Sequence, residues 1–316
     1  MDPLACAAAL GVALAVDRWF GEPRASRHPV VWMGRYLEVV GGRIAPPAGG
    51  PAPGPAKEFT LGMAAWLAGA LVVTSVAYVL QQALLQLPVA AAALLAGLAL
   101  KPLLSWRMLA EETAAVEGAL ADSLAAGRSR LARLVSRDVT ALDEAAVRES
   151  AIESLAENLN DSVVAPVFWF VLLGLPGAAL YRFANTADAM WGYRGERGGR
   201  VWEWAGKWSA RADDVLSWLP ARLSALLIAL VQRGFAWRAL RGEARRTPSP
   251  NSGWPMAAMA LALGVSLRKP GVYVLNGDAR SPRAADAQRA QVLASHAVGA
   301  MVALAAGTLV VLGWAA

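Results

Sequence analysis

The stretch FTLGMAAWLAGALVVTSVAYVLQQALLQLPVAAAALLAGLAL, residues 59–100, decides the fold. It contains two apolar runs, 59–80 and 84–100, and each is long enough to cross a bilayer as a helix. The only polar connection between them is the short segment 81–86. The stretch therefore predicts a membrane hairpin whose two flanking loops face the same compartment.

Other apolar segments extend this pattern along the chain, which is 56% hydrophobic, more than is usual for a soluble domain. Membrane segments are expected at 3–16, 163–181, 215–232 and 293–315. The run 3–16 lacks a preceding basic region, so we expect it to be retained and not cleaved as a signal peptide. The sequence thus predicts an all-α, polytopic membrane protein that forms one integral domain over residues 1–316.

The positions of the basic residues indicate the orientation in the membrane. All thirty Lys and Arg lie between Arg18 and Arg289. Both loops that flank the hairpin, 17–58 and 101–162, are basic, and the positive-inside rule places them in the cytoplasm of a bacterial cell. The net charge of +6 is assigned to these loops, and no nucleic-acid partner is expected because the basic residues form no single stripe.

Segment 163–181 carries Gly174-Leu175-Pro176-Gly177 in its middle, and Gly and Pro both interrupt a helix. A full crossing would also place the basic loop that follows on the outside. We therefore expect a broken, re-entrant segment that returns to the cytoplasmic side within protein or a water-filled cavity. Segment 215–232, with Pro220 and Arg222 near its start, is open to the same interpretation.

Residues 105–160 have apolar residues at helical spacing among charged ones, which predicts two or three amphipathic helices in the cytoplasm. A series of acidic residues spaced four apart forms one stripe along the last helix and beyond it: Glu149, Glu153, Glu157 and Asp161. Like charges at this spacing repel, so Arg137, Arg148 or a divalent cation is expected to neutralise them. The alternative is a solvated helix face.

Two further polar signatures lie beside apolar segments. Asn185 and Asp188 either share a helix face toward one ligand or cap a helix. Residues 249–255, Ser-Pro-Asn-Ser-Gly-Trp-Pro, predict a turn before a helix that opens at Met256, and amide groups at such a start can bind phosphate.

Asp213-Asp214 precede segment 215–232, so they either cap its helix or hold a metal ion. Lys207 and Arg211 lie close by in the sequence and can neutralise these carboxylates or bind phosphate. We expect all the polar signatures to face one cytoplasmic cavity.

The ordered set of short motifs resembles a known family over nearly the whole chain. The motifs are His28-Pro29-Val30 with Met33-Gly34, Arg137-Asp138, Glu153 with Ala156-Glu157-Asn158 and Asp161, Asn185-Thr186 with Asp188 and Met190, Asp213-Asp214, Pro220-Ala221-Arg222, and Ser249-Pro250-Asn251. Together they resemble the membrane-bound adenosylcobinamide-phosphate synthases of cobalamin biosynthesis.

The resemblance implies an ATP- and Mg²⁺-dependent ligase that joins adenosylcobyric acid to aminopropanol phosphate, or to aminopropanol, through an amide bond. The other expected partners are membrane lipid, other late enzymes of the pathway and a second copy of the chain in a homo-oligomer. The catalytic residues expected on this basis are His28, Arg137, Asp138, Glu157, Asn158, Asn185, Lys207 and Arg211. Those expected to bind substrate are Arg222, Ser249 and Asn251, and the expected Mg²⁺ ligands are Glu157, Asp161, Asp188, Asp213 and Asp214.

The sequence departs from the family pattern at several positions. Met256 stands where Glu commonly follows the Trp-Pro pair, Ser162 replaces a Gly, and Ala187 and Ala189 replace larger or hydroxylated residues. A transporter for a corrinoid or another polar metabolite is the alternative function, because broken helices with polar borders also occur there.

Overall fold

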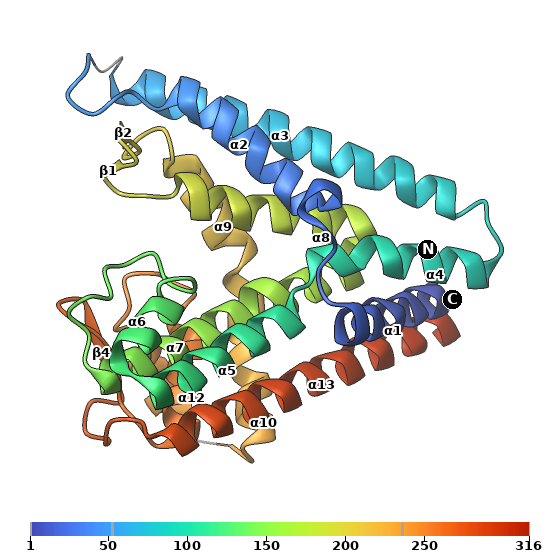
Figure 1. The fold of residues 1–316 in the computed structure, drawn as a ribbon. Coiled ribbons are helices and arrows are strands. Elements are labelled where there is room, and N and C mark those ends of the chain that lie inside the picture. Colours follow the sequence, from blue (N-terminus) through green and yellow to red (C-terminus); the bar gives the residue numbers. More distant parts are fainter. Residues whose placement is uncertain (1, 52–53, 235–236, 316) are drawn as a thin grey trace. The chain divides into compact units, whose positions relative to one another are not determined.

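The structure is a computed structural model that describes residues 2–51, 54–234 and 237–315. It is almost entirely helical, with two short β-hairpins, which confirms the predicted fold class (Figure 1). The chain divides into two compact units. The first comprises residues 1–104, 165–216 and 305–316, and the second comprises 105–164 and 217–304.

The first unit contains two long apolar helices, α3 and α8, together with shorter elements. Its elements are α1 (Pro3–Phe20), η1 (Ala25–Arg27), α2 (Pro29–Ile44), α3 (Pro55–Leu84), α4 (Val89–Leu100), η2 (Lys101–Leu103), α8 (Ala165–Trp191), β1 (Glu196–Arg197), β2 (Arg200–Val201) and α9 (Lys207–Leu216). Here α1 packs on α4, while α2, α3 and α9 pack on α8.

The second unit combines amphipathic and apolar helices. Its elements are α5 (Trp106–Asp122), α6 (Leu124–Leu131), α7 (Glu144–Leu159), a single π-helical turn η3 (Asn160–Val164), α10 (Trp218–Val231), α11 (Trp237–Ala244), α12 (Gly253–Leu263), β3 (Leu267–Lys269) and β4 (Tyr273–Leu275). Helix α13 (Ala284–Ala315) begins in this unit and ends in the first.

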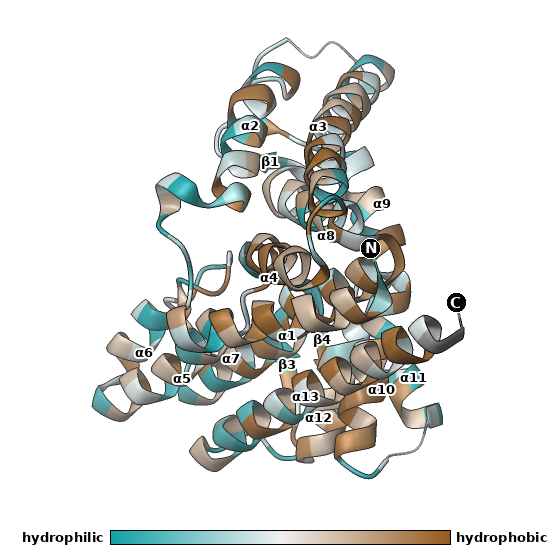
Figure 2. Ribbon diagram, turned by 90° about the vertical axis from the view of Figure 1, so that its right-hand side faces the viewer, coloured by the Kyte–Doolittle hydropathy of each residue, from teal (hydrophilic) through white to brown (hydrophobic). Residues whose placement is uncertain are grey.

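Five helical segments of the described residues are long and apolar enough to cross a membrane, and the bent pair α9–α10 makes a sixth if it counts as one span. The five are Pro3–Phe20, Pro55–Leu84, Val89–Asp122, Glu144–Trp191 and Ala284–Val311. Hydrophobic residues line most of α3, α4 and α12 in Figure 2, while hydrophilic ones mark α6 and α7. The chain therefore has the composition of a multi-pass membrane protein.

The break predicted in segment 163–181 is present. Gly174 has φ 68° and ψ −154°, a conformation that a side chain would strain, and it interrupts α8. The break leaves the backbone amide of Leu175 without its helical acceptor. This amide donates to Oε1 of Gln81 on α3 at 2.9 Å. A polar side chain thus supplies the partner that the interrupted helix lacks. Re-entry of this segment to the cytoplasmic side stays a prediction.

Three helices, α5, α6 and α7, form within residues 105–160 as predicted. Helix α7 is not amphipathic, because all its residues from Val147 to Ala156 are buried, and the position of the region outside the bilayer stays a prediction. Their apolar faces share one core cluster of buried residues: Val116, Leu120, Leu131, Val139, Leu142, Val147 and Ala151. This local packing gives the helical region its own hydrophobic support.

Several helices extend beyond the apolar segments that the sequence marked. The hairpin connection falls at 85–88, because α3 continues through the good helix formers Gln-Gln-Ala-Leu and Pro88 precedes the start of α4. Helix α13 starts at Ala284, before the predicted 293, because the carboxylate of Asp286 accepts from the amide of Arg283 and from the guanidinium of Arg280. These polar turns lack the apolar signal on which the prediction rested.

The packing of α1 on α4 generates the first prediction. A Cβ at Gly97 would lie 2.6 Å from the backbone oxygen of Ala9 and 2.6 Å from Cβ of Val12. Gly97→Ala should therefore push α1 from α4 and destabilise the protein by about 1–3 kcal/mol, seen as a lower melting temperature in detergent. Gly118→Ala in α5 is the matched control, because nothing lies within 4 Å of its new Cβ, and it should be neutral or slightly stabilising. Equal effects of the two changes would contradict this packing argument.

Candidate functional site

The acidic stripe of α7 is buried, so the interpretation as a solvated helix face is wrong. Glu149 is 2% exposed and Glu153 is 4% exposed. Buried carboxylates are costly unless positive charges and hydrogen bonds compensate them. The second unit supplies both kinds of partner from two separate segments.

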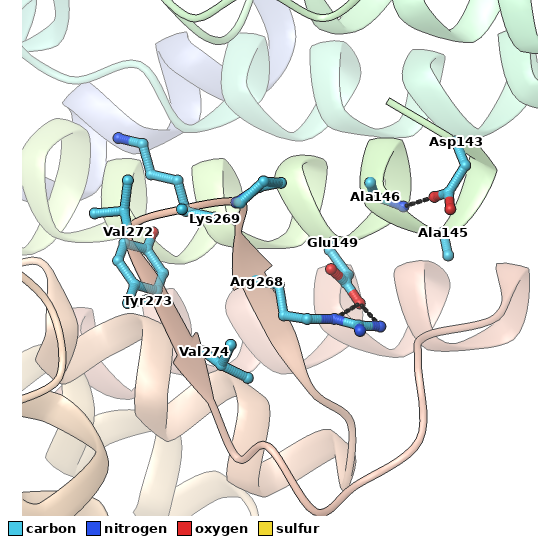
Figure 3. Close-up of a pocket in the computed structure, with 11 residues that line it drawn as sticks. Asp143, Ala145, Ala146, Glu149, Arg268, Lys269, Val272, Tyr273 and Val274 are labelled. Atoms are coloured by element: carbon cyan, nitrogen blue, oxygen red, sulfur yellow. Dashed lines mark hydrogen bonds and ion pairs between the residues drawn. The ribbon is translucent and has the colours of Figure 1, made fainter. Parts of the chain in front are cut away.

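Arg137 provides the first counter-charge, as the sequence predicted. Its Nη2 donates to Oε2 of Glu153 at 2.9 Å. Arg268 on β3 provides the second, with Nε and Nη2 donating to Oε1 of Glu149 at 3.1 and 3.0 Å. Figure 3 shows Arg268 reaching from the strand to Glu149, with the neighbouring Lys269 on the opposite side of the strand.

Arg148, the alternative counter-charge, does not neutralise the stripe. Its guanidinium pairs with Glu117 of α5 at 2.7 and 2.8 Å and with Glu144 at 2.8 Å. These contacts tie α7 to α5 on another face of the helix. Helical periodicity alone could not decide whether Arg137 or Arg148 pairs with the stripe. Arg137 lies in a loop, and periodicity does not describe the path of a loop.

A polar pocket of about 150 Å³ lies where α7 meets the β3–β4 hairpin, and we call it the α7 pocket. Its charged and polar lining includes Arg137, Glu153, Glu157, Asn158, Lys269 and Tyr273. Three of these were predicted as catalytic from the sequence, namely Arg137, Glu157 and Asn158. A larger pocket of about 560 Å³ adjoins the same hairpin and is lined by Asp143, Glu149 and residues 268–274 (Figure 3).

Several buried polar atoms in the α7 pocket lack a hydrogen-bond partner among the described residues. They are Nε and Nη1 of Arg137 and Oε1 of Glu153. Unsatisfied buried donors on a guanidinium are unusual, because each forgoes hydration. Nε and Nη1 point in different directions from the planar guanidinium, so each could donate to a separate acceptor, such as an oxygen of a carboxylate or phosphate group.

Sequence reasoning missed Lys269 and Tyr273. Burial, reinforced by the negative charge of Glu153, raises the pKa of Tyr273 well above its usual range. The phenol therefore stays a neutral hydrogen-bond donor at physiological pH. Its hydroxyl contacts Sδ of Met256 at 3.6 Å, so position 256 borders this site although it carries no acid. The only sequence signal was the Lys-Pro-Gly-Val-Tyr turn at 269–273.

The remaining predicted residues of the second unit lie elsewhere. Asp138 is exposed and accepts from the amide and hydroxyl of Thr140, a turn contact that lowers its pKa. Asp161 lies in η3, where Oδ1 accepts from Asn160. Arg222 donates to Oδ1 of Asn251 at 3.1 Å, and Ser249 Oγ accepts from the amide of Asn251 within the predicted turn.

The turn at 249–252 leads into α12 at Gly253, three residues before the predicted Met256. Arg222 also lies over the rings of Trp218 and Trp254, at 4.2 and 4.8 Å from their centroids. These residues therefore form a second polar and aromatic locus on α10 and α12.

The first unit carries the other predicted residues, and the capping alternatives are wrong for both aspartate signatures. Asn185 and Asp188 lie within the last turns of α8, and Asp213 and Asp214 lie near the end of α9. Lys207 is 3.7 Å from the ring centroid of Trp204 and 3.8 Å from Glu203, while Arg211 is exposed. Helices α8 and α9 pack together, so both signatures belong to one helix pair.

His28 caps α2 through Nδ1, which accepts from the amide of Val30 at 3.3 Å, and its Nε2 is 3.0 Å from Glu22. Glu22 also lies 2.8 Å from Nζ of the buried Lys101, which in turn lies 3.2 Å from Asp17. His28 is thus part of a buried charge network. Its assignment as a general base stays a prediction.

No group of three or more His, Cys, Asp or Glu side chains in the described part of the chain could hold a metal ion. The predicted ligands divide between the units, with Glu157 and Asp161 in the second and Asp188, Asp213 and Asp214 in the first. Each unit offers carboxylate oxygens in small numbers. This donor set fits Mg²⁺ held by one or two carboxylates together with substrate phosphates, and not an all-protein cage. Convergence of all five in one chamber stays a prediction.

Comparison with known proteins finds relatives over most of the chain. The family model described as CobD/Cbib protein matches residues 10–304. "Probable cobalamin biosynthesis protein CobD" of Methanothermobacter thermautotrophicus is 39% identical over 270 residues, which cover 84% of each chain. "Cobalamin biosynthesis protein CobD" of Chromobacterium violaceum is 42% identical over 273 residues, covering 82% of this chain and 80% of the relative. No solved structure matches the chain.

The network around Lys101 generates a stability prediction. Lys101→Met would leave Asp17 and Glu22 without their buried ammonium partner, which should destabilise the protein by about 3–5 kcal/mol. Thermal unfolding in detergent measures the loss. Lys57→Met, which removes an exposed lysine, should change stability little. Similar melting temperatures for the two variants would show that the buried contacts carry no net energy.

The same network predicts a direction for the pH dependence of stability. Burial alone would raise the pKa of Glu22, but hydrogen bonds from His28 and Lys101 and their charges lower it below the ordinary 4.5. Since the folded state holds this proton less tightly, its stabilisation is complete above about pH 4.5 and is lost as the pH falls through the folded-state pKa. Melting temperatures between pH 7 and pH 3 should fall less steeply for Glu22→Gln than for the unmodified protein, whereas parallel curves would contradict the assignment.

Proposed function

This chain belongs to the CobD/Cbib family, and from that premise we propose that it acts in cobalamin biosynthesis as an ATP-dependent amide ligase. Its substrates would be adenosylcobyric acid and (R)-1-aminopropan-2-ol phosphate or aminopropanol. The product would be adenosylcobinamide phosphate, or adenosylcobinamide with the unphosphorylated amine. Relatives named for cobalamin biosynthesis, at 33–42% identity, support the pathway assignment.

The observation that carries the reaction class is the α7 pocket. It combines cationic donors, a neutral phenol and carboxylates within about 150 Å³, and two buried donors of its Arg137 have no partner among the residues that the structure describes. A site of this composition suits a reaction in which negative charge builds up on oxygens and a proton leaves nitrogen.

Amide formation from a carboxylate first requires an activated acyl group. In the proposed reaction a carboxylate oxygen of the corrinoid takes the terminal phosphoryl group of ATP, and ADP leaves. The amine nitrogen then forms the C–N bond, phosphate leaves and nitrogen gives up a proton. Arg137 and Lys269 would hold the oxygens that carry charge in both steps, and Tyr273 would donate one hydrogen bond to them.

Asn158 is proposed to orient the amine, and Glu157 is proposed to receive its proton. Glu157 lines the pocket beside Asn158, whose Nδ2 donates to the backbone oxygen of Ser154 at 2.9 Å. That bond fixes the amide plane and leaves Oδ1 as an acceptor. Glu153 is the less suitable base, because Arg137 is already bonded to it.

Mg²⁺, when bound, would neutralise charge on the phosphoryl oxygens. The proposed ligands in the second unit are Glu157 and Asp161, and those in the first unit are Asp188, Asp213 and Asp214. Asn185, Lys207 and Arg211 are proposed to contact phosphate or substrate beside the aspartates of the first unit. Asp138 and His28 keep their proposed catalytic roles, and Arg222, Ser249 and Asn251 are proposed to bind polar groups of substrate.

The proposed setting is the bacterial cytoplasmic membrane, with the site open to the cytoplasm where ATP is available. Homo-oligomers and contacts with other late enzymes of the pathway are compatible with this setting. The exposed apolar residues of α3, among them Leu71, Val72 and Val76, support burial of that helix in lipid.

The direct experiment is to incubate the detergent-solubilised protein with ATP, Mg²⁺, adenosylcobyric acid and each amine separately. Mass spectrometry should reveal an amide product with one amine and release of ADP with it. Absence of product with both amines, from protein that is folded and monodisperse, would refute the ligase proposal.

The α7 pocket generates a kinetic prediction. Arg137→Gln should lower kcat by about 10²–10³, as the loss of one charged donor to a developing oxyanion does. It should also lower the melting temperature, because it leaves the buried Glu153 without its counter-charge, so kcat is measured at a temperature where the variant is folded. Arg133→Gln is the matched control, because that exposed arginine of the same segment does not line the pocket.

Asp161→Ala and Asp214→Ala should also abolish ligation while the protein remains folded. Full activity of both aspartate variants would remove the metal assignment.

A further inference from the structure

A separate pocket of about 730 Å³ lies among α10, α11 and the turn before α12, and we call it the Trp–Arg pocket. Three tryptophans and three arginines line it: Trp218, Trp237, Trp254, Arg222, Arg241 and Arg245. Among its described lining residues there is no Asp or Glu. The pocket therefore presents positive charge without a protein counter-charge.

The arginines differ in depth. Arg222 is half-buried and held by Trp218, Pro250 and Asn251 through hydrogen bonds of 2.6–3.3 Å. Arg241 and Arg245 are exposed; Arg241 lies in the last turn of α11 and Arg245 directly follows the end of the helix at Ala244. An anion at the rim could be reached by both exposed guanidinium groups.

The tryptophans give the same pocket an amphipathic wall. The rings of Trp237 and Trp254 lie 5.4 Å apart at 38°, and Trp218 and Leu219 are half-exposed beside them. Leu226 and Leu230 continue the exposed apolar surface along α10, which belongs to a helix pair apolar enough to span a membrane. Tryptophan and arginine at the end of such a helix are typical of the lipid headgroup level.

The charge of the segment agrees with that position. Residues 222–246 contain six arginines and one glutamate, Glu243, and Glu243 is engaged by Arg246 and by the amide of Asn276. Basic residues next to a membrane helix attract anionic lipid. Short α11 buries Leu240 and Ala244 while it exposes Trp237, Arg238 and Arg241, the pattern of a helix that lies in the interface.

We propose that the Trp–Arg pocket binds the phosphate of an anionic phospholipid, with Arg241 and Arg245 on the phosphate and the tryptophans against the glycerol and upper acyl region. The pocket is separate from the α7 pocket. Arg222 and Ser249, proposed above to bind substrate, also line it, so the lipid proposal rests on Arg241, Arg245 and the tryptophans, and its test measures binding without ligation. A free phosphate ester shares the phosphate chemistry but lacks the apolar part that the indole rings would contact.

The test is native mass spectrometry of the full-length protein titrated with phosphatidylglycerol, with phosphatidylcholine of the same acyl chains, and with inorganic pyrophosphate. We expect phosphatidylglycerol to bind preferentially. Arg241→Gln/Arg245→Gln should weaken that binding by about 30-fold, since each surface arginine contributes on the order of 1 kcal/mol to binding anionic lipid.

Arg238→Gln/Arg246→Gln is the matched control, because it removes the same charge from the same segment outside the pocket, and it should weaken binding only slightly. Trp237→Ala should weaken the binding of phosphatidylglycerol but not the binding of pyrophosphate. An equal loss of phosphatidylglycerol binding in both double variants would show attraction to net charge without a specific site. Tighter binding of pyrophosphate than of phosphatidylglycerol would assign the pocket to a soluble phosphate. Either result would overturn the proposal.

Discussion

The burial of negative charge on α7 is the constraint on which the second unit depends. Glu149 and Glu153 lie one turn apart with almost no exposure, and two unshielded carboxylates there would oppose folding. Arg268 and Arg137 compensate them from opposite directions in the sequence. The β3–β4 hairpin and the loop before α7 are thereby held against the same helix, and the α7 pocket is the space that remains between them.

The charge compensation between Glu153 and Arg137 is incomplete, and this has a chemical consequence. Glu153 uses one oxygen on Arg137, and Arg137 uses one of its three nitrogens on Glu153. A structural ion pair would gain by closing into a bidentate arrangement. The open donors, with Lys269 and the protonated Tyr273 beside them, instead suit an anionic group that arrives with a substrate.

The Lys101 network shows the same principle in the first unit. Asp17 lies in the last turn of α1, His28 caps the start of α2 and Lys101 follows α4, so three helix ends meet at Glu22 and its neighbours. Polar groups at helix ends need partners when they are buried, and here charged side chains supply them. In both units, charged side chains connect elements that hydrophobic packing alone would not orient.

The sequence by itself determined the helical class, the apolar segments and the break at Gly174, because periodicity and helix-breaking residues are local properties. For the acidic stripe it offered Arg137, Arg148 or a divalent cation as the counter-charge without choosing between them. It could not determine that the acidic stripe is buried, that Arg148 turns to Glu117, or that Lys269 and Tyr273 join the pocket. Those facts depend on which distant segments pack against α7. Burial and the choice of counter-ion are set by long-range contacts, and only the tertiary structure decides them.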